Sequence, residues 1–239
     1  MHCKKCKYWS PQNTKMSYPM SHNLSHHPDH AMLVEFSAGT LSTAESICVS
    51  AHLHFCEQCR AELQRLDQVG SQLLTEAEPA EVDEDLFDTV MAKIDSGEAD
   101  PEPVAVEKVQ GFPHSVSKLI KNPQHTPIWK RLSASVDIAR FKTGQSDFEV
   151  ALHRICAGGK TPKHDHSGVE YTVVLKGSFS DEQSIYKEGD FLVRQPGDVH
   201  QPMGAQNGEC ICLSALKAPI KLSNPLGFLM KPLLRINPM

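Results

Sequence analysis

A change of pattern near residue 100 constrains the fold of this chain more than any other feature of its sequence. Before that point apolar residues recur at helical spacing, as on the stripe formed by Leu86, Phe87, Val90, Met91 and Ile94. After it come short runs such as FEVALHRICAGG, EYTVVLKGSF and CICLSAL, bounded by turn residues in a way typical of strands. The 239-residue chain is therefore predicted to have an α + β multidomain fold.

The first half is predicted to form a four-helix domain over residues 23–94. Residues 29–39 (DHAMLVEFSAG) have the start and stop signals of a short helix. Ser42 and Glu45 match a capping box, which opens a second helix that runs into a cysteine motif. A third helix follows the motif, and the apolar stripe at 86–94 marks the fourth.

The remaining segments are assigned from composition and from the strand pattern. Residues 1–22 are polar and lack periodicity, so a disordered tail is expected. Residues 95–110 are acidic and contain prolines, which is typical of a linker. Residues 111–239 carry several short strands without helical patterns between them, which predicts a β-sandwich or barrel.

The cysteine motif HLHFCEQC at 52–59 predicts a metal site. On a helix, positions i, i+4 and i+7 share one face, so His52, Cys56 and Cys59 would project together. Zinc accepts such mixed imidazole and thiolate ligands in a tetrahedron, with one ligand still missing here. A thioredoxin-like redox pair would need a βαβ context that this region lacks. Ordinary buried thiols are disfavoured because the neighbouring residues are polar.

A second group of metal-ligating residue types lies in the β half. Residues of equal parity on a strand face the same way, so His164, His166 and Glu170 can point together into a barrel. His200 can join them from another strand. Three imidazoles and one carboxylate would hold zinc, iron, manganese, nickel or copper, and the ligand types alone do not select among these metals.

Charge and hydropathy exclude several classes of protein. The net charge of −5 argues against direct, non-specific binding of nucleic acid. No segment approaches the roughly 18–20 apolar residues of a membrane helix, and no signal peptide is recognisable. A cytoplasmic protein without membrane association is expected. In that compartment the eight cysteines are expected to be ligands or redox-active thiols rather than disulfides.

The β half resembles the cupin family. Its residues match the first cupin motif, G(x)5HxH(x)3,4E(x)6G, from Gly158 to Gly177. In the second motif, G(x)5PxG(x)2H(x)3N, the glycines at 189 and 197 and the following His200 match in spacing. Gln195 and Gly204 depart from that motif, which weakens any transfer of one cupin enzyme's chemistry. The resemblance covers about residues 125–217 and implies a cupin β-barrel.

A helical head with an Hx3Cx2C motif followed by a cupin resembles the ChrR-type zinc-binding anti-sigma factors. That resemblance implies a fourth zinc ligand from a histidine before the first helix. Counting back from the Ala38–Gly39–Thr40–Leu41 stretch places His27 at the matching position, with His26 and His30 as competitors. The implied zinc site consists of His27, His52, Cys56 and Cys59. The implied cupin site holds Zn²⁺ or another divalent transition metal.

The resemblance also implies a function. The helical head would sequester a group IV (ECF, extracytoplasmic-function) sigma factor and hold it away from core RNA polymerase. The cupin would release the sigma factor under singlet oxygen or organic hydroperoxide. From Glu76 to Asp88 there are seven acidic residues and no basic one, which suits competition for a basic partner. An ordinary solvated face explains that segment equally well.

Two other functions compete with this interpretation. One is a metal-dependent cupin enzyme of the dioxygenase type with a helical appendage, and the other is a sensor acting on an unknown partner. No additional acid–base pair stands out near the motifs, so no catalytic residues are assigned and no enzyme activity is expected. A homo-oligomer through the cupin stays open. Cys210 and Cys212 share parity on one strand and form either a redox pair or part of the core, with the core favoured.

Overall fold

The computed structural model describes residues 24–97, 109, 111–122 and 127–222. The predicted tail and most of the predicted linker lie outside these residues. The described part contains helices followed by strands, which confirms the predicted fold class. The helices are α1 (His30–Ser37), α2 (Thr43–Phe55), α3 (Glu57–Glu76), α4 (Leu86–Asp95) and α5 (His114–Ile120). The first four correspond to the predicted helices, whereas α5 was not predicted.

Side-chain caps define where the first three helices begin. The Asp29 side chain accepts a hydrogen bond from Met32 N at the start of α1. Ser42 and Glu45 form the predicted capping box of α2, with both hydrogen bonds present. Cys56 ends α2 in an extended conformation, and its Sγ accepts a hydrogen bond from Cys59 N to cap α3. Because α2 stops there, the cysteine motif spans a helix–helix junction and not the single helix that the spacing had predicted.

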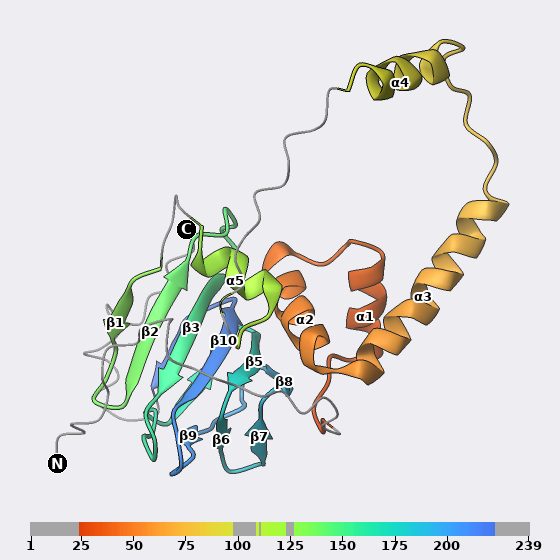
Figure 1. Cartoon of the computed structure of the whole chain (residues 1–239). Helices are drawn as coiled ribbons and strands as arrows, with labels where there is room; N and C mark the ends of the chain where they lie inside the picture. The colour runs from red at the N-terminus through yellow and green to blue at the C-terminus, as the bar shows by residue number, and fades with distance from the viewer. Residues whose placement is uncertain (1–23, 98–108, 110, 123–126, 223–239) are drawn as a thin grey trace.

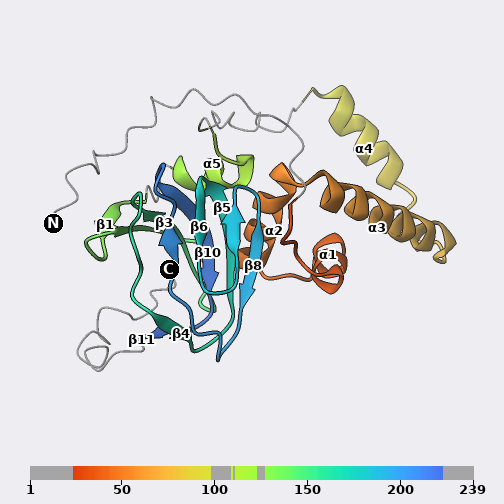
Figure 2. The same cartoon turned by 90° about the horizontal axis from the view of Figure 1, so that it is seen from below.

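The β half is built from antiparallel strands in three sheets (Figures 1 and 2). The largest has the order β1-β2-β3-β10-β5-β8, and the smaller ones are β7-β6-β9 and β11-β4. Their bounds are β1 (Trp129–Arg131), β2 (Val136–Phe141), β3 (Glu149–Ile155), β4 (His164–His166), β5 (Glu170–Lys176), β6 (Ser178–Ser180), β7 (Ile185–Lys187), β8 (Phe191–Arg194), β9 (Met203–Gly204), β10 (Cys210–Leu216) and β11 (Ile220–Leu222).

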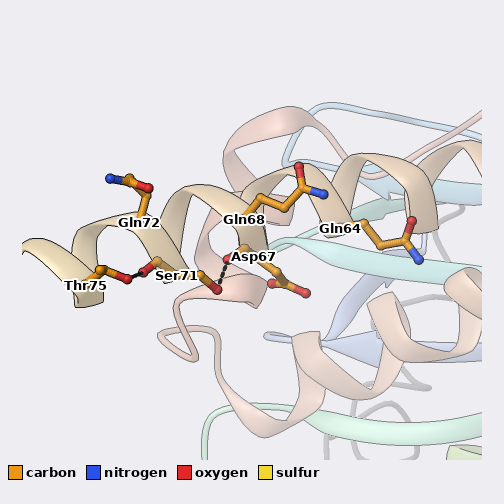
Figure 3. Close-up of a pocket in the computed structure, with 6 residues that line it drawn as sticks. All are labelled: Gln64, Asp67, Gln68, Ser71, Gln72 and Thr75. Carbon is orange, nitrogen blue, oxygen red and sulfur yellow. Dashed lines mark hydrogen bonds between the residues drawn. The ribbon is translucent and has the colours of Figure 1, made fainter.

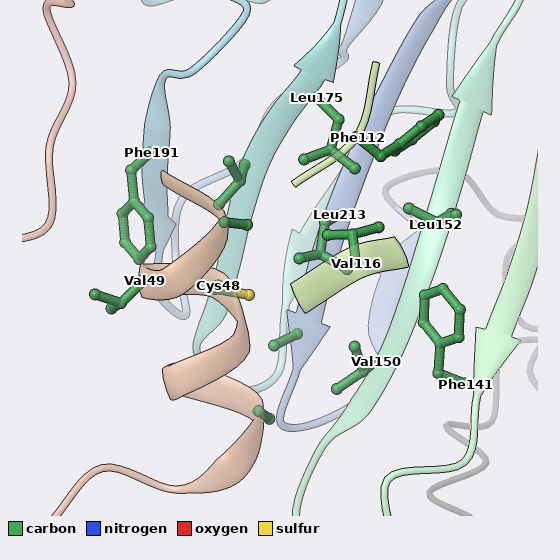
Figure 4. Close-up of a cluster of buried hydrophobic side chains, with 14 of the residues drawn as sticks. Cys48, Val49, Phe112, Val116, Phe141, Val150, Leu152, Leu175, Phe191 and Leu213 are labelled. Atoms are coloured by element: carbon green, nitrogen blue, oxygen red, sulfur yellow. The ribbon is translucent and has the colours of Figure 1, made fainter. Parts of the chain in front are cut away.

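One face of the six-stranded sheet packs against α2 and α5. Figure 4 shows Cys48 and Val49 of α2 and Val116 of α5 facing side chains of β3, β5, β8 and β10. The helical half and the β half therefore share one hydrophobic core. Burying a single aliphatic side chain of this kind contributes about 1.5–3 kcal/mol, so the contact between the halves is a substantial part of the stability.

The opposite face of the sheet packs against the small sheet β7-β6-β9. Phe179 and Tyr186 from that small sheet contact apolar side chains of the large one. Cys210 and Cys212 belong to this second cluster, with their Sγ atoms 3.6 Å apart. Cys156 is disulfide-bonded, so the expectation of ligands or redox-active thiols rather than disulfides is wrong at this cysteine.

The C-terminal part of α3 and the whole of α4 are exposed. Every residue of α4 is exposed to solvent, and α4 stands apart from α1 and α2 in Figure 1. Along α3 a hollow is lined by polar side chains, among which Ser71 Oγ donates to Asp67 O and Thr75 Oγ1 donates to Ser71 O (Figure 3). Among the described residues, none of the helices combines the length and apolar character needed to cross a bilayer.

Candidate metal centres

The first candidate centre brings together His27, His52, Cys56 and Cys59. One potential ligand atom from each residue lies within 4.8 Å of all the others. His27 Nδ1 is 3.4 Å from both sulfur atoms, and His52 Nε2 is 3.3 Å from Cys59 Sγ. Ligands at about 2.0–2.3 Å from an ion in a tetrahedron are themselves roughly 3.3–3.8 Å apart. The four atoms therefore fit one tetrahedral ion.

Hydrogen bonds orient both histidines of this centre. His52 Nδ1 donates to the carbonyl oxygen of Gly189 at 2.7 Å, which leaves the Nε2 lone pair directed at the cysteines. His27 Nε2 donates to Leu24 O at 3.1 Å, which leaves Nδ1 for the centre. A carbonyl can only accept, so each contact fixes which ring nitrogen carries the proton. Such outer contacts commonly set the orientation of metal-binding histidines.

The two competing histidines lie outside the centre. The His26 ring packs against Tyr186 at 4.8 Å between ring centroids, and its Nδ1 is 3.7 Å from Asp190 Oδ2. His30 Nε2 is 3.2 Å from Glu62 Oε1 on the surface. The structure therefore brings His27, and neither of its competitors, to the cysteines.

The electrostatics of the first centre suit a bound cation. Burial lowers the pKa of His52 to about 4, so the ring is neutral and its lone pair is available. Burial raises the pKa of Cys59 to about 12, and the charge and hydrogen bond of Cys56 add to the rise. The buried Cys59 thiol thus resists ionisation unless a cation compensates, and a thiol that binds a metal ion is deprotonated outright. This donor set fits a metal such as zinc.

The second candidate centre consists of His164, His166 and His200. Their Nε2 atoms converge: those of His166 and His164 are each 3.2 Å from that of His200. Two of the rings come from β4, and His200 forms a backbone bridge with His164. Burial lowers the pKa of His164 to about 4, which keeps that ring neutral and able to bind a metal.

Each of these rings has a partner on its other nitrogen. His164 Nδ1 donates to Pro162 O at 2.9 Å, and His200 Nδ1 donates to Asp181 Oδ2 at 3.0 Å. His166 Nδ1 is 3.1 Å from Glu170 Oε2. All three Nε2 atoms are thus left facing one another. Asp181 was missed by the sequence analysis, because no motif spacing ties it to the histidines.

Glu170 lies behind His166 and outside the cluster of three nitrogens. It begins β5, whereas His164 and His166 lie on β4, so a shared strand parity is not what brings them together. Burial would raise the pKa of Glu170, but the hydrogen bond and charge of His166, with smaller contributions from His153 and His164, lower it to about 2. The carboxylate is therefore charged. It is placed to orient His166 and adds negative charge beside the centre.

Known proteins resemble this chain over nearly its whole length. The family described as the ChrR cupin-like domain matches residues 121–219. The anti-sigma-E factor ChrR of Cereibacter sphaeroides is 33% identical over 213 residues, which make up 89% of this chain and 99% of that protein. Among solved structures, the crystal structure of Rhodobacter sphaeroides SigE in complex with the anti-sigma ChrR matches with a TM-score of 0.68. That match has 32% identity and covers 80% of this chain and 98% of the other.

Proposed function

Because the chain belongs to the ChrR family of anti-sigma factors, we propose that it sequesters a group IV (ECF) sigma factor and so represses transcription. The role is regulatory, and the site of action is the cytoplasm, where sigma factors meet RNA polymerase. The partner of ChrR in the matched structure, SigE, supports a sigma factor as the partner here.

The observation that carries this proposal is an uncovered apolar surface on α3 and α4. On α3, Val69, Leu73 and Leu74 are exposed by 58, 63 and 78%. On α4 the exposed apolar residues are Leu86, Phe87, Val90, Met91 and Ile94. An isolated 10-residue helix is marginal in water, and an apolar face on it indicates a partner. We call these eight residues the α3–α4 surface.

The charge near the α3–α4 surface favours a basic partner. The seven acidic residues between Glu76 and Asp88 occupy the end of α3, the connection and the first turn of α4, and all of them are exposed. A sigma factor must present basic surfaces to promoter DNA. An acidic segment next to an apolar helix can cover such a surface and exclude its normal ligand.

The two centres are proposed to hold metals with different roles. In the head, Zn²⁺ on His27, His52, Cys56 and Cys59 would tie the segment before α1 to the α2–α3 junction, which is a structural role. In the cupin, Zn²⁺ or another divalent transition metal on His164, His166 and His200, with Glu170 beside them, would leave an open position. That centre is proposed to be where singlet oxygen or organic hydroperoxide triggers release.

Co-expression with group IV sigma factors from the same genome tests the proposal. A tagged chain should retain one sigma factor at one-to-one stoichiometry, and the purified complex should inhibit sigma-dependent transcription in vitro. Metal analysis should find one zinc ion fewer per chain in a Cys56→Ala Cys59→Ala variant than in the unsubstituted chain, and an unchanged zinc content would contradict the head site. Failure to retain any sigma factor under conditions where the chain is folded would contradict the function.

A cupin enzyme is the competing function, because three converging imidazoles with an open position could also bind a chelating substrate. Turnover of candidate chelating substrates by the metal-loaded chain, without binding of any sigma factor, would favour this alternative. The α3–α4 surface would then have no role.

A further inference from the structure

The turn between β7 and β8 contacts both candidate metal centres. We call residues 186–191, from Tyr186 to Phe191, the coupling turn. At one end, the Gly189 carbonyl accepts the hydrogen bond of His52, a ligand of the head centre. Gly189 has a φ of +94°, and a Cβ there would meet Phe55 Cβ at 2.8 Å, so backbone and α2 are in direct contact. The cupin thus supplies the outer contact that orients a ligand of the other domain.

The coupling turn also holds the segment that carries His27. Asp190 Oδ1 accepts hydrogen bonds from the backbone nitrogens of Ser25 and His26, at 3.2 and 3.4 Å. Phe191 N donates to His26 O at 3.0 Å. Asp190 is 1% exposed, and its Oδ2 accepts from Lys187 N within the turn at 2.8 Å. Both histidine ligands of the head are therefore positioned by the same six residues of the cupin.

The other end of the coupling turn reaches the cupin centre through Tyr186. Its hydroxyl donates to Asp181 Oδ1 at 3.1 Å and accepts from Arg194 at 2.6 Å. Asp181 Oδ2 accepts from His200 Nδ1, so one buried carboxylate joins Tyr186 to a ligand of the cupin centre. The ring of Tyr186, in turn, packs against His26. The contacts run without a gap from His200 to the ligands of the head.

We propose that the coupling turn links the two metal centres, so that metal binding in the cupin tightens metal binding in the head. The inference rests on the proposed function in that it names how the cupin regulates the sigma-binding head. Tyr186 and Asp190 are positioning residues, since they act through His200, His27 and His52 and contact no metal themselves.

The direction of the coupling follows from what each contact can order. Metal on His200 fixes the imidazole, and the Nδ1 hydrogen bond then fixes Asp181, whose side chain has no exposed area. Asp181 holds the Tyr186 hydroxyl, and the turn presents Gly189 and Asp190 to the head. The first metal ion to bind, at either centre, thus bears the entropy cost of ordering the coupling turn. The other centre then binds its metal ion more tightly, because the turn is already ordered.

Cobalt binding to the full chain measures this coupling without any sigma factor. Co²⁺ on thiolates has a sulfur-to-metal charge-transfer absorption that a centre of histidines lacks, so the head centre is read separately from total bound cobalt. Three full-length chains are compared. The first is unsubstituted, the second keeps only the head centre because it carries His164→Ala and His166→Ala, and the third keeps only the cupin centre because it carries Cys56→Ser and Cys59→Ser. Neither set of substitutions touches the coupling turn.

The product of the two cobalt affinities in the unsubstituted chain should exceed the product from the single-centre chains by about fivefold or more. Tyr186→Phe keeps the ring and removes the bridging hydroxyl, so the ratio of the two products should fall close to one, which means that the excess is lost. Tyr171→Phe is the matched control: Tyr171 lies against Phe191 at the same domain contact but outside the path to His200, and the excess should persist. If Tyr186→Phe does not fold, Asp190→Asn tests the head side of the turn with the same expected loss.

No excess in the unsubstituted chain would overturn the inference. So would an excess that survives Tyr186→Phe, or one that Tyr171→Phe removes equally, which would indicate general loosening of the domain contact. Sigma binding is measured separately by retention on the tagged chain. If the chain binds a sigma factor but the two centres are not coupled, only this inference is refuted. If the centres are coupled but the chain binds no sigma factor, only the proposed function is refuted.

Discussion

Gly189 is a single backbone position at which the two halves approach each other closely. Its φ of +94° is one that side-chain-bearing residues rarely adopt, and α2 leaves no room for a Cβ. The cupin motif predicts a glycine at position 189. It does not predict that the carbonyl of this glycine orients His52. The residue therefore serves both the turn conformation and the head centre.

Gly189→Ala should destabilise the chain more than Gly197→Ala does. Both glycines have a positive φ, but a Cβ at Gly197 would meet nothing within 4 Å. Gly197→Ala should cost only the backbone strain of about 1–2 kcal/mol. Gly189→Ala should add a steric cost of about 1–3 kcal/mol, because Phe55 must move. Urea unfolding of both variants measures the difference, and equal losses would show that the contact with α2 relaxes freely.

Substituting the three neighbouring histidines one at a time tests the assignment of His27. His27→Ala should remove a ligand and lower the zinc affinity of the head by several orders of magnitude, because three ligands are left. His30→Ala should leave zinc affinity unchanged, since that ring pairs with Glu62 on the surface, outside the centre. His26→Ala should have a smaller effect, through Tyr186 and Asp190. Zinc competition with a chromophoric chelator gives the three affinities, and a larger loss at His26 or His30 would reassign the ligand.

At the scale of elements, the α2–α3 junction and the α3–α4 surface have opposite characters. At the junction, Cys56 ends one helix and caps the next, and the side chains of the centre are buried or half-buried. Toward α4, every side chain is exposed, and among the described residues α4 forms no extensive contact with another helix or strand. A buried centre followed by an exposed helix leaves the apolar side chains of α4 accessible to a partner.

Polar substitution on the apolar stripe of α4 should weaken sigma binding without changing the stability of the free chain. Phe87→Ser removes a side chain that is 72% exposed, so the free energy of unfolding should change by less than about 0.5 kcal/mol. If the stripe is buried in the complex, affinity should fall roughly tenfold or more. Ala92→Ser, on the side of α4 opposite the stripe and also exposed, is the matched control. Equal affinities for the two variants in calorimetric titration would remove α4 from the interface.

At the scale of the whole molecule, the shared core changes the expectation for the isolated head. A flexible linker between two halves would by itself allow each half to fold independently, but α2 contributes Val49, Ala51 and Cys48 to a core that the β half completes. Separating the halves would expose these side chains and remove the Gly189 contact from His52. The head therefore depends on the cupin for part of its stability.

Residues 24–97 alone should still bind the sigma factor but hold zinc less tightly. Loss of an outer contact to a metal ligand typically lowers metal affinity about 10–100-fold, and Gly189 supplies such a contact here. Chelator competition on the fragment and on the full chain measures the ratio. An unchanged affinity would mean that the head orients His52 by itself.

Replacing a cupin ligand should separate repression from response. His164→Ala leaves the α3–α4 surface and the head ligands in place, so sigma binding should be retained. Release under singlet oxygen or organic hydroperoxide should be lost, because the responding centre lacks a ligand. A sigma-dependent reporter with and without oxidant checks both parts. Normal induction in this variant would place the sensor in the head.

Local sequence determined most of the helices and strands and most of the candidate ligands. Helical periodicity, the capping box at Ser42 and short strand runs depend on neighbours within a few residues, and the structure confirms them. The spacings around His52 and His164 are local in the same sense. His27 required the resemblance to a family, since three histidines within five residues are equivalent by spacing alone.

Tertiary structure alone decided how those parts act on one another. His52 and Gly189 are 137 residues apart, and His200 is oriented by Asp181, which belongs to neither cupin motif. The position of Glu170 behind His166 follows from the interruption of the strand at residues 167–169, between β4 and β5, which the sequence pattern does not reveal. Such contacts depend on which surfaces pack together, and packing reflects the summed burial of many side chains. That sum depends on the whole folded chain, so the spacing of residues within a single motif cannot predict it.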